Sequence, residues 1–161
     1  MAKMSSIQAG DKAPAAVLPT SDGRQIALAD FEGKNAVVLF FYPKDNTSIC
    51  TKEACSFRDS YEDFVAAGAV VIGISSDSDA DHRSFAEQHR LPFTLVADTN
   101  GSLRKTFGVP RTLGILPGRV TYVIDKAGIV RHVFNSQLLG QKHVTEALRI
   151  VRELSGQTTG T

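Results

Sequence analysis

The chain has 161 residues, with 18 basic and 17 acidic side chains and a formal net charge of +1. This balance gives no electrostatic reason to expect binding to nucleic acid or to an anionic membrane surface. The composition, 42% hydrophobic and 22% charged, is ordinary for a globular domain. A chain of this length suits one domain with one core, which needs neither a disulfide nor a metal to be stable.

No apolar run approaches the roughly 20 residues that a membrane helix requires, so we expect no membrane association. The segment from Met1 to Pro14 is polar and lacks the hydrophobic stretch of a signal peptide. We therefore expect a cytoplasmic protein, with an organelle stroma as the alternative if a transit peptide has been removed. The chain contains two cysteines, Cys50 and Cys55. They are too few for a disulfide-stapled secreted domain or a complete zinc site, so the pair is either incidental or redox-active.

The first half of the chain shows a hairpin and then a buried strand. Residues 1–15 are predicted to form an exposed, partly flexible entry segment. The turn sequence Ser21-Asp22-Gly23 separates two short strands, which predicts a small hairpin over 16–28. A continuous apolar run from Ala36 to Tyr42, ended by Pro43, predicts a buried central strand.

Helices and strands alternate after this point. An apolar stripe predicts one helix over 48–67, with Gly68 as its C-terminal cap. Further helices are predicted at 79–89, 102–107 and 140–154, and further strands at 69–75, 93–97, 120–124 and 129–134, the last two joined as a hairpin. A loop over 108–118 contains five Gly or Pro residues, and the tail 155–161 is predicted to be disordered.

This order predicts an α/β domain over 16–154, with a mixed sheet flanked by helices and an N-terminal hairpin extension. A thioredoxin-like arrangement has the same order.

Cys50 follows the buried strand and lies in the first turn of a predicted helix. Unpaired backbone N–H groups there favour a thiolate over a thiol. Thr47 is placed either to cap the helix or to offer its hydroxyl to a bound oxygen, and Pro43 fixes the loop. By position alone, Cys50 is either a reactive thiol or a small core residue, and Cys55 is more readily explained by packing.

The segment from Phe41 to Asp59, Phe-Tyr-Pro-Lys-Asp-Asn-Thr-Ser-Ile-Cys-Thr-Lys-Glu-Ala-Cys-Ser-Phe-Arg-Asp, resembles the active-site segment of peroxiredoxins. Pro43, Thr47 and Cys50 match the family's spacing of Pro, three residues, Thr, two residues and Cys. The second cysteine five positions later resembles the bacterioferritin-comigratory-protein or peroxiredoxin Q branch, with plant and cyanobacterial members most alike. Similar segments are found at 71–75, 91–95, 108–110, 116–125 and 142–143.

The resemblance implies the thioredoxin-like fold and a role for each cysteine. Cys50 would be the peroxidatic nucleophile, which a hydroperoxide oxidises to a sulfenic acid, and Cys55 would be the resolving thiol. A thioredoxin-type protein would reduce the resulting disulfide, and the protein would be a monomer.

The resemblance also implies roles for residues around the thiol. Thr47 and Arg119 would orient the peroxide and stabilise the thiolate, and Pro43 would shield the site. Glu53 matches a recurrent acidic position nearby. By pattern alone, Arg119 at the start of a strand would be a surface charge.

One departure from the branch concerns the two residues before the nucleophile, which are Ser48-Ile49 here instead of Pro-Gly. Ile cannot replace Gly where φ is positive, so this difference bears on rate and substrate preference. The four histidines are spread over separate elements, and we expect surface or packing roles for them: His82, His89, His132 and His143. We assign neither a metal nor a cofactor.

Two other functions compete with a peroxidase. The first is a thiol-disulfide oxidoreductase or a redox-regulated binding protein, although thioredoxin-type enzymes have two residues between their cysteines and four lie between these. The second is a non-enzymatic interaction module that uses the apolar loop Leu113–Leu116.

Overall fold

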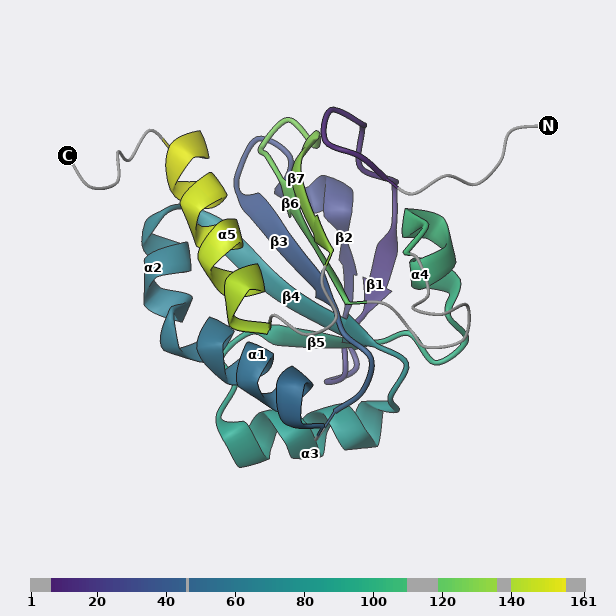
Figure 1. Ribbon diagram of the computed structural model, residues 1–161. Coiled ribbons are helices and arrows are strands. Elements are labelled where there is room, and N and C mark those ends of the chain that lie inside the picture. The colour runs from purple at the N-terminus through teal and green to yellow at the C-terminus, as the bar shows by residue number, and fades with distance from the viewer. Residues whose placement is uncertain (1–6, 46, 110–118, 136–139, 156–161) are drawn as a thin grey trace.

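The computed structural model describes residues 7–45, 47–109, 119–135 and 140–155. They form a central sheet with helices on both faces and a small separate hairpin (Figure 1). The strands are β1 (Val17–Pro19), β2 (Gln25–Ala27), β3 (Ala36–Phe41), β4 (Ala69–Ser75), β5 (Thr94–Ala97), β6 (Val120–Ile124) and β7 (Val130–Asn135). The helices are η1 (Leu28–Phe31), α1 (Ser48–Asp59), α2 (Tyr61–Ala66), α3 (Asp79–His89), α4 (Ser102–Phe107) and α5 (Gly140–Leu154). Among the described residues, no helix is long and apolar enough to cross a bilayer.

The five-stranded sheet has the order β5-β4-β3-β6-β7 and is mixed, as the sequence predicts. Strands β3, β4 and β5 run parallel, whereas β6 runs antiparallel to β3 and β7 antiparallel to β6. In this register Phe41, the last residue of β3, pairs with Val120, the first residue of β6. The chain leaving β3 therefore lies beside the chain entering β6, at one edge of the sheet.

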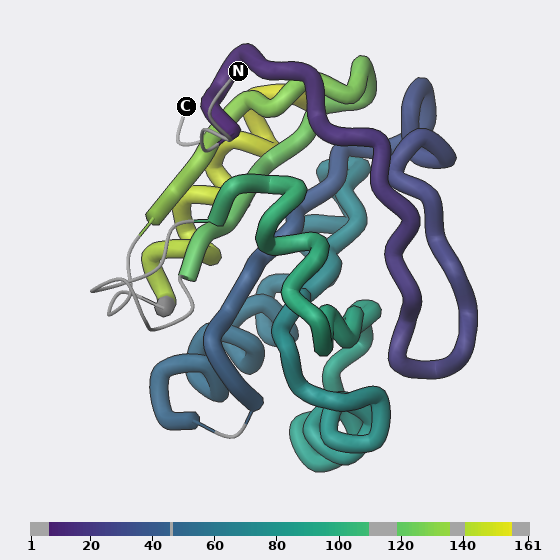
Figure 2. Tube along the Cα trace, turned by 90° about the vertical axis from the view of Figure 1, so that its right-hand side faces the viewer, coloured from purple at the N-terminus to yellow at the C-terminus, as the bar shows by residue number. Residues whose placement is uncertain are grey.

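Alternate residues of β3 serve two separate cores, because successive side chains of a strand point to opposite faces. Val38 and Phe40 belong to the core under α1, α2, α3 and α5. Val37 and Leu39 belong to the core on the other face, which α4 and the β1–β2 hairpin cover. In Figure 2 the purple-to-blue hairpin lies along the right edge of the molecule. Since both faces of β3 are buried, its sequence is continuously apolar rather than alternating.

Gly73 in β4 leaves room for an aromatic ring below α1. It pairs with Phe40 on one side and Leu95 on the other. A Cβ atom at Gly73 would lie 2.7 Å from Phe40 Cζ and 2.9 Å from Leu95 Cδ2. The Phe40 ring stacks on Phe57 of α1, with centroids 4.3 Å apart. The missing side chain of Gly73 thus helps to seat the helix that carries both cysteines.

The structure corrects the helix predicted over 48–67, which is divided into α1 and α2. Ser60 takes φ −100° and ψ 6°, a sparsely allowed conformation that is not helical, and so separates the two helices. The 3-10 helix η1, which follows the hairpin directly, was not predicted. Within the expected entry segment, backbone N–H groups of Ile7 and Gly10 donate to carbonyls of Phe107 and Val130. Residues 110–118, including Leu113–Leu116, and 156–161 lie outside the described residues.

Candidate active site

The loop after β3 delivers Cys50 into the first turn of α1. Thr47 precedes the helix, and Cys50 is its third residue. The thiol is 1% exposed and packs at the margin of the core below α1. The Thr47 hydroxyl donates to the carbonyl of Lys44 at 2.9 Å, and it does not cap the helix. Of the two roles expected for Thr47, the capping role is therefore wrong, and the role towards a bound oxygen stays a prediction.

Arg119 lies directly before β6 and reaches the sulfur of Cys50. Its Nη2 donates to Cys50 Sγ at 3.0 Å, and its Nη1 donates to Glu53 Oε1. This contact is possible because β6 pairs with β3 in antiparallel register, which places the chain entering β6 beside the chain leaving β3. Arg119 is 3% exposed, so the surface position that its pattern suggests is wrong. A buried cation in contact with sulfur favours the thiolate.

Glu53 is fully buried one turn after Cys50 on α1, and burial raises the pKa of its carboxyl to about 8, although Arg119 acts in the opposite direction. Its Oε2 lies 3.7 Å from His143 Nδ1, which is 2.7 Å from the Thr121 hydroxyl. The guanidinium of Arg119 thus lies between the Cys50 sulfur and a carboxyl whose burial disfavours the charged form. His143 is buried and packs edge-on against Phe134, so the surface position offered for it is wrong, and it has polar contacts as well as packing contacts.

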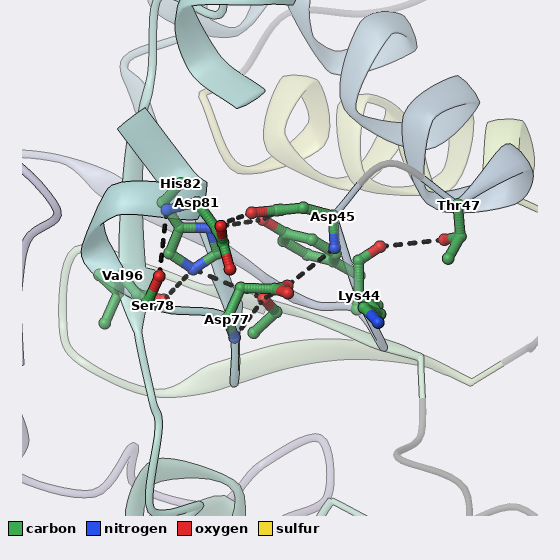
Figure 3. Close-up of polar contacts among 10 residues, drawn as sticks. Lys44, Asp45, Thr47, Asp77, Ser78, Asp81, His82 and Val96 are labelled. Carbon is green, nitrogen blue, oxygen red and sulfur yellow. Dashed lines mark hydrogen bonds and ion pairs between the residues drawn. The ribbon is translucent and has the colours of Figure 1, made fainter. Parts of the chain in front are cut away.

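A second polar network holds the loop between β3 and α1 (Figure 3). The Asp45 carboxylate accepts a hydrogen bond from the Tyr42 hydroxyl at 2.6 Å and lies 2.7 Å from His82 Nδ1. The Asp45 backbone N–H donates to Asp77 Oδ2 at 2.8 Å. These contacts tie the loop that precedes Cys50 to α3 and to the segment after β4.

His82 is fully buried in this network, with an acceptor at each ring nitrogen. Its Nδ1 faces the Asp45 carboxylate and its Nε2 lies 3.0 Å from the Val96 carbonyl. Two acceptors require two ring protons, so the imidazolium form fits this site. Burial opposes the charge, but Asp45 outweighs it and the pKa of His82 is raised above 6.5. Asp45, Asp77 and His82 each have an atom that could bind a metal ion, and these atoms lie within 4.8 Å of one another. The Asp45 carboxylate is already bonded to His82 Nδ1.

The sequence interpretation did not assign Asp45 and His82 to the site. A signal was present, because His82 lies three residues before Phe85, the predicted inward residue of α3, and so shares its face.

Cys55 also lies on α1, but it contacts neither Arg119 nor Glu53 through its sulfur, and it is half-buried. Its Sγ is 3.8 Å from Nδ1 of His89 on α3. Both cysteines are free thiols. The structure thus brings Cys50, Arg119 and Glu53 together, and places Cys55 in different surroundings.

Pro43 and Ile49 flank the site and are both half-buried. The helix already includes Ser48 and Ile49, and Arg90 is the only non-glycine residue with positive φ in the described part of the chain. Ile49 therefore meets no backbone penalty where the branch has Gly, and its effect is confined to the bulk of its side chain.

Several known proteins are similar in sequence to this chain. The model of the AhpC/TSA family matches residues 9–133. A chloroplastic peroxiredoxin Q of Triticum aestivum is 50% identical over 149 residues, which cover 92% of this chain and 68% of the relative. One of Populus jackii is 48% identical and covers 92% and 70%.

Solved structures of known proteins have a similar fold. Peroxidoxin BcpB of Mycobacterium tuberculosis superposes with a TM-score of 0.84 at 36% identity, covering 92% of this chain and 98% of that one. The bacterioferritin comigratory protein of Xanthomonas campestris, described with an alkyl peroxide reduction activity, superposes with a TM-score of 0.82 at 26% identity, covering 92% and 99%. The thioredoxin-like fold expected from the sequence is therefore confirmed.

Proposed function

Since the chain belongs to the AhpC/TSA family of peroxiredoxins, it is a thiol peroxidase, and we propose that Cys50 is the thiol that reduces the hydroperoxide. The observation that carries this assignment is the hydrogen bond from Arg119 Nη2 to Cys50 Sγ. Cys55 has no such cationic partner among the described residues that contact its sulfur, since His89 is the neighbour there. Of the two thiols, Cys50 is the one in contact with a guanidinium, a permanent cation that favours the thiolate.

In the proposed reaction, the Cys50 thiolate attacks one peroxide oxygen and the O–O bond breaks. Sulfur keeps the attacked oxygen as a sulfenic acid, and the other oxygen leaves and takes a proton to become water or an alcohol. The guanidinium of Arg119 faces the position where negative charge passes from sulfur to oxygen. Thr47 and Pro43, at the two ends of the loop before α1, are proposed to orient and shield the peroxide.

Cys55 is proposed to resolve the sulfenic acid as an intramolecular disulfide, which a thioredoxin-type reductant then reduces. Organic hydroperoxides are proposed substrates alongside hydrogen peroxide, given the alkyl peroxide reduction described for the Xanthomonas campestris relative. The plant relatives are described as chloroplastic, which supports the organelle alternative, and the cytoplasmic location stays a prediction. A monomer also stays a prediction.

The test is peroxide consumption with thioredoxin and its reductase, together with the number of thiols lost after one equivalent of hydrogen peroxide. Cys50→Ser should abolish consumption. Cys55→Ser should retain the first, stoichiometric oxidation and lose efficient recycling. Consumption by Cys50→Ser at the parental rate would show that another group is the nucleophile. A thiol-disulfide oxidoreductase without peroxidase turnover would keep both thiols on this time scale.

A further inference from the structure

The neighbour of the Cys55 sulfur is an ionisable ring that has no part in the site around Cys50. His89 is the last residue of α3, and its Nδ1 lies 3.8 Å from Cys55 Sγ. The ring is held edge-on against Phe85, with centroids 5.0 Å apart. Both Cys55 and His89 are half-buried, so a proton at this contact can exchange with solvent.

A second contact fastens the same part of α1 to the end of α3. Arg58 Nη1 donates to the backbone carbonyl of His89 at 2.8 Å. Arg58 is also the charged side chain that meets this helix end from α1. Cys55 and Arg58 lie three residues apart and so share one face of α1, which is directed at the end of α3. The helix is therefore held here while its first turn carries Cys50.

We propose that His89 is a catalytic base for the second half of the peroxidase cycle. This inference rests on the proposed role of Cys55 as the resolving thiol. His89 Nδ1 takes the proton of the Cys55 thiol, and the Cys55 thiolate attacks the sulfur of the Cys50 sulfenic acid. The S–S bond forms as the S–O bond breaks, and the departing hydroxide takes a proton to become water. The peroxide has already supplied the oxidising equivalent, so no other oxidant is required.

The assignment solves a specific difficulty, which is that an ordinary thiol is a poor nucleophile at neutral pH. A free cysteine has a pKa of about 8.5, so only about 3% of it is thiolate at pH 7. A base that touches the thiol and accepts its proton as the sulfur attacks removes this limit, and the gain at pH 7 is at most about 30-fold. The carboxyl end of α3 favours the positive charge that His89 would gain, whereas the Arg58 guanidinium at the same carbonyl opposes it.

The test separates the two oxidation steps in the full-length reduced protein. One equivalent of hydrogen peroxide is added, and sulfenic acid trapped by dimedone and the Cys50–Cys55 disulfide are both followed by mass. His89→Gln keeps a polar side chain but cannot take the proton, and Gln88→Ala is a matched control at an exposed position of the same turn. We expect equal sulfenic acid formation in all proteins. Disulfide formation by His89→Gln should be about 10- to 30-fold slower at pH 7, with the difference vanishing above about pH 9.

A second measurement follows the reactivity of Cys55 alone, so it does not depend on whether α1 unwinds. In a Cys50→Ser background, Cys55 is alkylated with iodoacetamide at pH 7, and His89→Gln should slow this reaction by a similar factor. Equal rates with and without His89 in either measurement overturn the inference. A parent protein that forms no Cys50–Cys55 disulfide instead shows that the proposed role of Cys55 is wrong, and the role of His89 falls with it.

Discussion

Cys50 and Cys55 lie in one helix with their sulfur atoms turned to different partners, Arg119 for the first and His89 for the second. Five helical residues advance about 7.5 Å along the axis and turn about 500°, so the two side chains point roughly 140° apart. On a helix radius of about 2.3 Å, the two Cα atoms are more than about 8 Å apart. A disulfide tolerates at most about 7 Å between Cα atoms. The two thiols therefore cannot bond while α1 is intact.

Oxidation is thus expected to unwind the start of α1. Helix starts have the fewest backbone hydrogen bonds, and the contacts of Arg58 with the end of α3 hold the later part of the helix. Thr51 N–H donates to the Thr47 carbonyl, so amide hydrogen exchange of residues 51–54 should be slow in the reduced protein and fast in the oxidised one, while residues of β3 stay protected in both. Equal protection of 51–54 in the two states, with the disulfide confirmed by mass, would contradict the coupling between oxidation and unwinding.

Removal of the Arg119 charge should slow the first oxidation. Arg119→Met loses a charged hydrogen bond to Cys50, which is worth about 2 kcal/mol, or about 30-fold in rate. Stopped-flow measurement of sulfenic acid formation at pH 7 gives the rate directly. Arg131→Met, at an exposed arginine of β7, is the matched control and should react at the parental rate. A rate for Arg119→Met equal to that of this control would remove Arg119 from the chemistry.

The Glu53 carboxyl should make stability depend on pH. Its pKa rises from 4.5 to about 8 on folding, so the native state holds a proton that the unfolded state releases between these values. The contribution to the free energy of unfolding is complete below about pH 4.5 and is lost as the pH rises towards 8. Glu53→Gln removes this dependence, because its amide does not titrate.

Urea unfolding of reduced protein at pH 5, 6, 7 and 8 measures the effect. The stability of Glu53→Gln relative to the parent should increase steadily across the series. Glu62→Gln, at an exposed position of α2, serves as the control and should show a constant difference. A constant difference for Glu53→Gln as well would mean that Glu53 keeps the same proton affinity in the folded and unfolded chain.

A side chain at Gly73 should disturb the seat of α1. The Cβ of Gly73→Ala would lie under 3 Å from both Phe40 and Leu95, and overpacking of this kind costs about 1–3 kcal/mol of stability. Chemical denaturation measures the loss. Phe40→Leu removes the ring and should make the alanine at 73 less costly, so the double variant is expected to be more stable than the sum of the two single effects. Strict additivity would show that the Phe40 ring does not set the cost.

Sequence patterns predict most of the sheet and the position of Cys50 at the start of a helix. Buried strands such as β3 and β4 are continuous apolar runs, and α1 begins where the polar loop after β3 ends. The division of the predicted helix at Ser60 was not foreseen, because the apolar stripe continues through it.

The surroundings of Arg119 were also beyond local patterns. A charged residue before a strand is ordinarily exposed, and only the antiparallel pairing of β6 with β3 buries it against Cys50. Likewise, local patterns do not show that α3 lies beside the loop that carries Asp45, and this placement is what brings His82 to the Asp45 carboxylate.

The contact between Cys50 and Arg119 forms late in the synthesis of the chain. Arg119 follows Cys50 by 69 positions in the chain, and β6 lies between β3 and β7 in the sheet. While the chain is still being synthesised, Cys50 leaves the ribosome long before its guanidinium partner exists. Until β6 pairs with β3, this cysteine lacks the cation that stabilises its thiolate and behaves as an ordinary thiol. The surroundings that favour this thiolate therefore arise only when the sheet is complete, so the reactivity proposed for Cys50 depends on the pairing of two strands that are made far apart in time.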